Sequence, residues 1–192
     1  MRESSGPDPP AGFHPYTPAP DTPFGFVARG LAGGWLLAVI GLGALVWLNQ
    51  DHYSIGAVAV VALVTTVVHE LVHAAVGWLL GLELTAGFDI AGLETGPYIL
   101  TYGEFQTRRE SALLAAAPTL VLAPVFVLLM VVGSTATALA ALAALFVNTL
   151  GAVGDLRVVV TTLQLPPDAL EYHTSSGEVR YYVRAEAGSS GR

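Results

Sequence analysis

Two histidines and a glutamate, His69-Glu70-Leu71-Val72-His73, lie within a long apolar stretch of the chain. In a helix, residues four apart share a face, so the imidazoles of His69 and His73 can ligate one metal ion together. Glu70 lies about 100° around the same helix, which suits a general base acting on water better than a third ligand. The HExxH spacing is typical of a zinc centre that hydrolyses peptide bonds.

The apolar setting of this motif strengthens the interpretation. Between Ile55 and Leu80 the clearly polar side chains are Thr65, Thr66 and the three motif residues. Ionisable groups at membrane depth are costly and mark functional sites. Three titratable side chains in one apolar helix therefore need a compensating partner. A metal ion is the partner that their types favour, and polar packing without a metal is the alternative.

A catalytic zinc ion needs a third protein ligand, and two acidic residues are candidates. Asp155 is expected on a later apolar helix, seven residues after Asn148 and therefore on the same face. That helix and the motif helix are expected to cross the membrane in the same direction, which places Asp155 and the histidines at similar depths. Glu94, 21 residues after His73, is the alternative, although the glycines around it favour a loop.

The residues of the later helix also have structural interpretations. Asp155 could pair with Arg157 near the membrane surface or simply end the helix. Asn148 could form a hydrogen bond between helices, worth about 1 kcal/mol. Gly151 and Gly154 predict that this helix packs closely against a neighbour.

The composition defines the class of protein in which this chemistry takes place. Of the 192 residues, 53% are hydrophobic and 12% are charged, about half the charged share of a soluble domain. The net charge of -7 argues against nucleic acid as a partner. The absence of cysteine excludes disulfides and thiolate ligands. We therefore expect a multi-pass protein of the cell membrane, with the lipid bilayer as its surroundings.

The apolar stretches predict the fold. A span takes about 20 residues, and four stretches are long enough: Phe26–Leu48, Ile55–Leu80, Ser111–Val132 and Thr135–Thr161. The predicted fold is an all-α polytopic membrane protein with a strand-like cytoplasmic loop and a C-terminal hairpin. Its parts are a disordered proline-rich tail (1–24), a four-helix transmembrane metalloprotease domain (25–165) and a cytoplasmic tail (166–192).

The segments outside the spans carry their own signals. Residues 1–24 are rich in proline and have no apolar core, which predicts disorder and excludes a signal peptide. The connector 81–110 contains strand-like pieces at Leu82–Phe88 and Tyr98–Tyr102, separated by glycines. The tail 166–192 alternates like a hairpin, for which we expect the role of a solvated or interfacial cap.

The third apolar stretch has signals at its start and in its interior. Thr107 and Glu110 have the spacing of a capping box. Pro118 and Pro124 interrupt the helix that follows. Prolines in a membrane helix free backbone carbonyls and produce kinks, which here serve either packing alone or the opening of the site.

The arginines predict the orientation. All eight basic residues are arginine, and none lies in the two short loops 49–54 and 133–134. With four spans, every segment that contains arginine falls on one side. The positive-inside rule therefore places both termini and the connector 81–110 in the cytoplasm.

These residues resemble a family of membrane zincin peptidases, classed as a domain of unknown function, and more distantly the site-2 proteases. The resemblance rests on the sequence HELVHAAVG at 69–77, on Ala-Ala-Ala-Pro at 115–118, and on Asn148 followed by Asp155. It extends over about residues 26–185.

The resemblance implies a role for each residue of the site. In site-2 proteases the metal ligands are the two motif histidines and a later aspartate, which implies Zn²⁺ bound by His69, His73 and Asp155. Glu70 becomes the general base, and Asn148 the residue that holds substrate or stabilises charge.

The last motif departs from the site-2 pattern. Site-2 proteases have prolines and an Asp-Gly pair there, whereas this chain has Gly151, Gly154 and Asp155-Leu156. The resemblance also implies that the segment 82–105 holds unwound substrate as an added strand, with an ordinary cytoplasmic loop as the alternative.

The predicted function is zinc-dependent endoproteolysis in or near the cytoplasmic half of the membrane. The expected substrates are membrane-embedded or membrane-associated proteins or peptides. A non-proteolytic metal-binding or regulatory scaffold is the alternative, and such a protein would not need Glu70. A metal transporter would need polar residues on several spans, which the first and third stretches do not supply.

Overall fold

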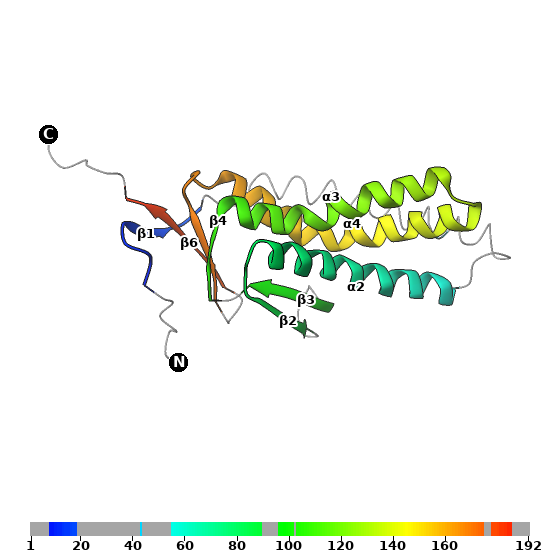
Figure 1. The fold of residues 1–192 in the computed structure, drawn as a ribbon, viewed down its shortest axis with the longest axis horizontal. Helices are drawn as coiled ribbons and strands as arrows, with labels where there is room; N and C mark the ends of the chain where they lie inside the picture. Colours follow the sequence, from blue (N-terminus) through cyan, green and yellow to red (C-terminus); the bar gives the residue numbers. More distant parts are fainter. Residues whose placement is uncertain are drawn as a thin grey trace, which may run out of the picture.

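Three long apolar helices make up most of the structure, a computed structural model that describes residues 8–18, 43, 55–89, 96–101, 103–174 and 178–185. They are α2 (Ile55–Leu79), α3 (Arg108–Val132) and α4 (Thr135–Gln164). Each is long and apolar enough to cross a membrane. The helices α2 and α4 run in the same direction and α3 runs in the opposite one (Figure 1).

Three of the four predicted spans are therefore confirmed as helices. The first predicted span, Phe26–Leu48, lies outside the described residues except for Gly43, which is helical. The fourth extends to Gln164, three residues beyond the predicted end at Thr161.

The helices bury small residues between them and expose large apolar ones. Ala117 of α3 and Ala144 of α4 are buried, whereas Leu71 of α2 and Leu128 of α3 are exposed. Small residues let helix backbones approach closely, and in a bilayer the exposed apolar side chains would contact lipid. The distribution of side chains therefore suits a bundle in a membrane.

Side-chain and backbone contacts fix the ends of α3 and α4. Thr107 and Glu110 form the predicted capping box at the start of α3. Ser134 caps α4 by accepting a hydrogen bond from the backbone amide of Thr137. At the other end of the bundle, Arg108 donates to the carbonyl of Leu165 at 2.8 Å. This bond satisfies a carbonyl at the C-terminus of α4 and ties it to the start of α3.

A four-stranded antiparallel sheet lies at the end of the bundle where α2 and α4 finish and α3 begins (Figure 1). Its strands, in the order β1-β6-β5-β4, are Phe13–Tyr16, Val179–Arg184, Leu170–His173 and Phe105–Thr107. The pairing of β5 with β6 confirms the predicted C-terminal hairpin. The sequence did not predict that the connector and the N-terminal segment add strands to this hairpin.

The strand β1 corrects the predicted disorder of residues 1–24 at Phe13–Tyr16. These residues pair with β6, whose edge supplies backbone hydrogen-bond partners. Pro15 is tolerated because β1 is an edge strand, where a missing amide hydrogen need not break a ladder. The guanidinium of Arg184 lies 5.6 Å from the ring centroid of Phe13, which adds a cation–π contact.

A separate hairpin, β2 (Leu84–Asp89) and β3 (Gly96–Thr101), packs against α2 (Figure 1). Its strands confirm the two strand-like pieces predicted in the connector. A Cβ atom on Gly77 of α2 would lie 2.6 Å from a methyl group of Leu84. The absence of a side chain at residue 77 therefore lets the start of β2 approach the last turns of α2.

Candidate metal centre

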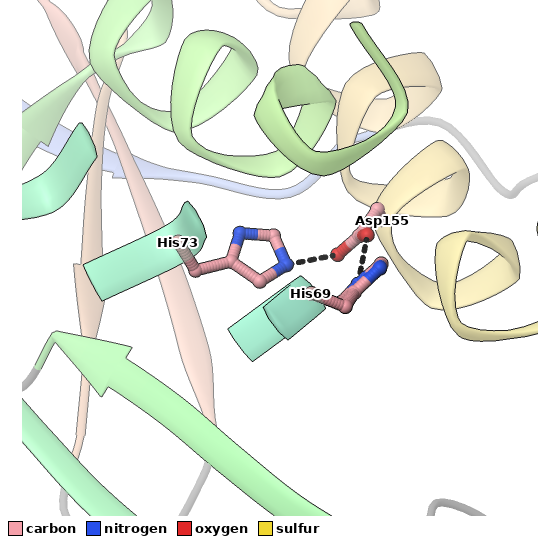
Figure 2. Close-up of side chains that lie close together, drawn as sticks. All are labelled: His69, His73 and Asp155. Atoms are coloured by element: carbon pink, nitrogen blue, oxygen red, sulfur yellow. Dashed lines mark ion pairs between the residues drawn. The ribbon is translucent and has the colours of Figure 1, made fainter. Parts of the chain in front are cut away.

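His69 and His73 of α2 and Asp155 of α4 point toward one another in the bundle (Figure 2). The His69 Nε2 atom lies 3.1 Å from Asp155 Oδ2, and the His73 Nε2 atom lies 3.3 Å from Asp155 Oδ1. Each residue offers one ligand atom, and the three atoms all lie within 4.8 Å of one another. The three side chains could therefore hold one metal ion.

The second nitrogen of each imidazole is also engaged. His69 Nδ1 lies 3.1 Å from the side-chain oxygen of Asn148, and His73 Nδ1 lies 2.9 Å from the backbone oxygen of Leu114. Both partners are acceptors, so each Nδ1 donates a hydrogen. A neutral imidazole that donates through Nδ1 has no hydrogen on Nε2, and its Nε2 lone pair faces Asp155.

This arrangement passes a physical test for a metal site. Nε2 atoms without a hydrogen repel a facing carboxylate unless a metal ion binds between them or the rings take up a second proton. The Asp155 Oδ2 atom is buried and accepts no hydrogen bond within the described part of the chain, although His69 Nε2 is 3.1 Å away.

Two nitrogen–oxygen distances, which end on different oxygens of Asp155, are close to those around a tetrahedral ion. Ligand atoms about 2.0–2.1 Å from a tetrahedral zinc ion lie about 3.3 Å apart, close to the two distances from the Nε2 atoms of His69 and His73 to Asp155. Histidines that ligate a metal commonly donate their other ring N–H to a carbonyl, as both do here. The donor set therefore fits zinc.

The glycine at position 151 lets α4 approach the first histidine. A Cβ atom on Gly151 would lie 3.3 Å from His69 Cε1, closer than ordinary van der Waals contact. The predicted close packing of this helix is therefore confirmed at Gly151.

The structure brings together four of the residues predicted from sequence: His69, His73, Asn148 and Asp155. Asp155 faces the histidines, in agreement with the expectation that these residues lie at similar depths in the membrane. Glu70 is partly buried on α2, directly after His69 in the chain. Glu94, the alternative ligand, lies outside the described residues.

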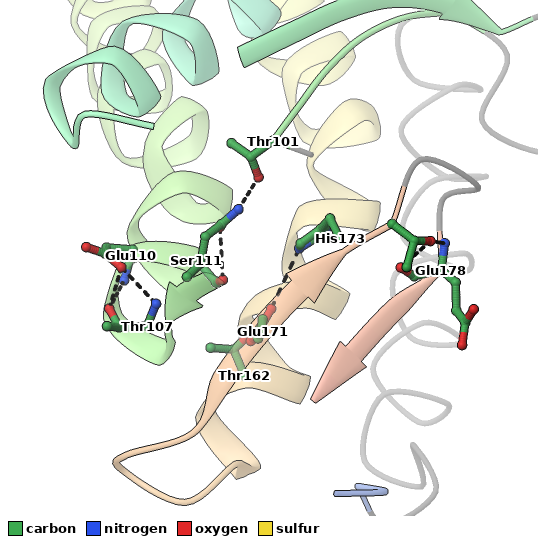
Figure 3. Close-up of polar contacts among 10 residues, drawn as sticks. Thr101, Thr107, Glu110, Ser111, Thr162, Glu171, His173 and Glu178 are labelled. Atoms are coloured by element: carbon green, nitrogen blue, oxygen red, sulfur yellow. Dashed lines mark hydrogen bonds and ion pairs between the residues drawn. The ribbon is translucent and has the colours of Figure 1, made fainter. Parts of the chain in front are cut away.

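Sequence reasoning missed the carbonyl of Leu114, because a backbone acceptor has no distinctive residue type. It also missed a buried polar network where the strands meet α3 and α4 (Figure 3). Gln106 of β4 donates to Thr101 of β3 and accepts from Ser111 of α3, the latter at 3.2 Å. The network thus begins at the end of the β2–β3 hairpin and reaches the first turn of α3.

The same network contains a buried carboxylate. Glu171 of β5 is 1% exposed and accepts a hydrogen bond from Thr162 of α4 at 2.6 Å. Burial raises the pKa of the Glu171 carboxyl, and the hydroxyls of Thr162 and Ser111 partly oppose this rise. His173 Nε2 lies 3.9 Å from Glu171, and burial lowers the pKa of that imidazole.

Residues 62–170, more than half of the chain, match the model of a family described as "putative zincin peptidase". The chain belongs to this family, as the sequence motifs predicted. The matched region contains His69, His73, Asn148 and Asp155, so the family and the candidate centre coincide. Searches of curated proteins and of solved structures returned no match.

Proposed function

We propose that the protein is a zinc-dependent endopeptidase of the membrane, similar in its chemistry to the site-2 proteases. The observation that carries this proposal is the convergence of two Nε2 atoms and the Asp155 carboxylate between two helices that could each span a bilayer. Membership of a zincin peptidase family supports both the metal and the reaction.

The residues of the site have separate roles in the proposed reaction. Zinc, held by His69, His73 and Asp155, would polarise a peptide carbonyl and lower the pKa of water to about 7. Glu70 takes the proton of the attacking water and delivers it to the nitrogen of the leaving amine.

Asn148 supports the centre through both ends of its amide. Its oxygen fixes the orientation of His69. Its Nδ2 atom is buried and has no hydrogen-bond partner among the described residues. A buried donor without a partner is costly, and a substrate oxygen that develops negative charge would satisfy it. This supports the role of Asn148 in holding substrate or stabilising charge.

The β2–β3 hairpin is the proposed platform for substrate. Within the described residues, β2 and β3 pair only with each other, so each keeps one edge without a partner strand. The hairpin packs against α2, the helix that carries both histidines. A peptide bond within a helix is shielded, so a substrate must unwind before cleavage and could add to this hairpin as a strand.

The arginines support a multi-pass topology in the cell membrane with both termini in the cytoplasm. Arg108 begins α3, and Arg180 and Arg184 lie in the sheet at the same end of the bundle. The opposite turn, Gly133-Ser134, has no charge. In this topology the metal centre lies in the cytoplasmic half of the membrane, and the substrates are membrane-embedded or membrane-associated peptides.

Replacing Glu70 by glutamine tests the peptidase. We expect Glu70→Gln to keep about one zinc per chain while cleavage of a library of membrane-spanning peptides in proteoliposomes falls about 100-fold or more. The change removes the proton acceptor but no predicted ligand. Metal analysis and product mass spectrometry provide the two readouts.

Two further variants complete the experiment. Glu178→Gln makes the same chemical change at an exposed residue outside the proposed substrate platform and should cleave normally, whereas His69→Ala should lose zinc. Undiminished cleavage by Glu70→Gln would contradict the mechanism. Zinc bound by the wild-type protein without cleavage of any library peptide would favour a non-proteolytic metal-binding scaffold.

A further inference from the structure

The carbonyl of Leu114 is available to His73 because of the residue one helical turn later. In an uninterrupted α-helix the carbonyl of residue 114 accepts the amide hydrogen of residue 118. Residue 118 is a proline, which has no amide hydrogen. The proline ring also collides with the carbonyl four residues before it and tilts that carbonyl outward. His73 Nδ1 lies 2.9 Å from the oxygen thus released.

We propose that Pro118 is a positioning residue of the metal centre, because it frees the Leu114 carbonyl to hold the His73 ring with its hydrogen on Nδ1. This inference rests on the proposed function, in which His73 is a ligand. A ring held in this way presents Nε2 to Asp155 without a hydrogen. The other tautomer would place a hydrogen where the metal binds.

A second proline in the same helix shows that position determines the effect. Pro118 is below 2% exposed and lies on the side of α3 that is buried in the bundle, with Ala115 and Ala117. Pro124 is exposed, and it releases the carbonyl of Leu120, whose side chain is 65% exposed. Each proline leaves a backbone carbonyl without its usual helical partner, but of the two released carbonyls it is that of Leu114 that contacts a predicted metal ligand.

The test compares the tautomer of His73 in three proteins. Protein labelled with nitrogen-15 at histidine is prepared without metal in detergent at alkaline pH, as wild type, Pro118→Ala and Pro124→Ala. The nitrogen chemical shifts distinguish a protonated from a bare ring nitrogen, and His73→Gln identifies the His73 signals. Zinc affinity is then measured by competition with a chromophoric chelator.

We expect the wild type and Pro124→Ala to hold His73 with the hydrogen on Nδ1 and to bind zinc equally well. Pro118→Ala restores an amide that reclaims the Leu114 carbonyl. Its His73 should therefore populate the Nε2–H tautomer, and zinc should bind about tenfold more weakly or worse, as when other partners of metal ligands are removed. If Pro118 only bent the helix, replacing it would not change the tautomer of His73.

Three results would overturn the proposal. They are an Nε2–H tautomer in the wild type, a Pro118→Ala protein with unchanged tautomer and affinity, and an equal loss in Pro124→Ala. Pro118→Val restores the same amide, keeps more of the buried volume and takes the place of Pro118→Ala if that variant does not fold. The tautomer is measured without metal or substrate. Its outcome therefore does not depend on whether the protein cleaves peptides, and the two proposals can fail independently.

Discussion

The two histidines of the candidate centre are held by acceptors of different kinds. Asn148 offers a side-chain oxygen to His69, whereas Leu114 offers a backbone carbonyl to His73. Residue types and spacing predicted that His69, His73 and Asp155 would converge, because ionisable groups stand out in apolar helices. The Leu114 acceptor could not be predicted in this way, since every residue has a carbonyl and only the packed helices show which one His73 reaches.

Replacing Asn148 by alanine tests the side-chain acceptor. The residue is 1% exposed, so no water can easily take the place of its oxygen. We expect zinc to bind about 10- to 100-fold more weakly to Asn148→Ala, measured by chelator competition, because His69 loses the group that fixes its Nδ1 hydrogen. Thr149→Ala is the control, because this exposed neighbour bonds the carbonyl of Leu145 in its own helix. Equal affinities in both variants would contradict the role of Asn148.

At the scale of elements, local patterns predicted helices and hairpins but not their assembly. Alternating residues predicted the C-terminal hairpin, and the apolar runs predicted α2, α3 and α4. The strand β1 escaped prediction because Phe13–Tyr16 has few apolar residues and its partner, β6, lies at the other end of the chain. Pairing between such distant segments depends on the edge that the rest of the fold presents, which no local pattern contains.

The packing of α4 on His69 gives a prediction at this scale. A methyl group at residue 151 would lie 3.3 Å from the His69 ring, so the ring or the helix must move by a few tenths of an ångström. Overpacking of this kind costs about 1–3 kcal/mol. We expect Gly151→Ala to weaken zinc binding and Gly151→Leu to abolish it, measured by metal analysis and chelator competition. Leu150→Ala changes an exposed neighbour and should bind normally; normal binding by Gly151→Leu would refute the close contact.

At the scale of the whole molecule, buried polar groups join the sheets to the bundle. The network runs from Thr101 of β3 through Gln106 and Ser111, and α4 reaches Glu171 of β5 through Thr162. The helices α3 and α4 also carry the Leu114 carbonyl and Asp155, so the sheet is anchored to the two helices that complete the metal centre. The alternating hairpin predicted a solvated or interfacial cap, and the end of the bundle covers the side of the sheet that carries Glu171.

The buried carboxylate of this network makes stability depend on pH. The unfolded chain protonates Glu171 near the ordinary pKa of 4.5, and burial raises the pKa in the folded chain. The folded state then holds the proton more tightly, so this contribution to stability is complete below pH 4.5 and is lost as the pH rises through the folded pKa.

Glu171→Gln stays neutral and can still accept the hydrogen bond from Thr162. In detergent, we expect the midpoint temperature of thermal unfolding of Glu171→Gln to increase relative to that of the wild type as the pH rises. Glu178→Gln, at an exposed site in the same hairpin, should show no such increase. Parallel curves for Glu171→Gln and the wild type would mean that Glu171 does not titrate at a raised pKa.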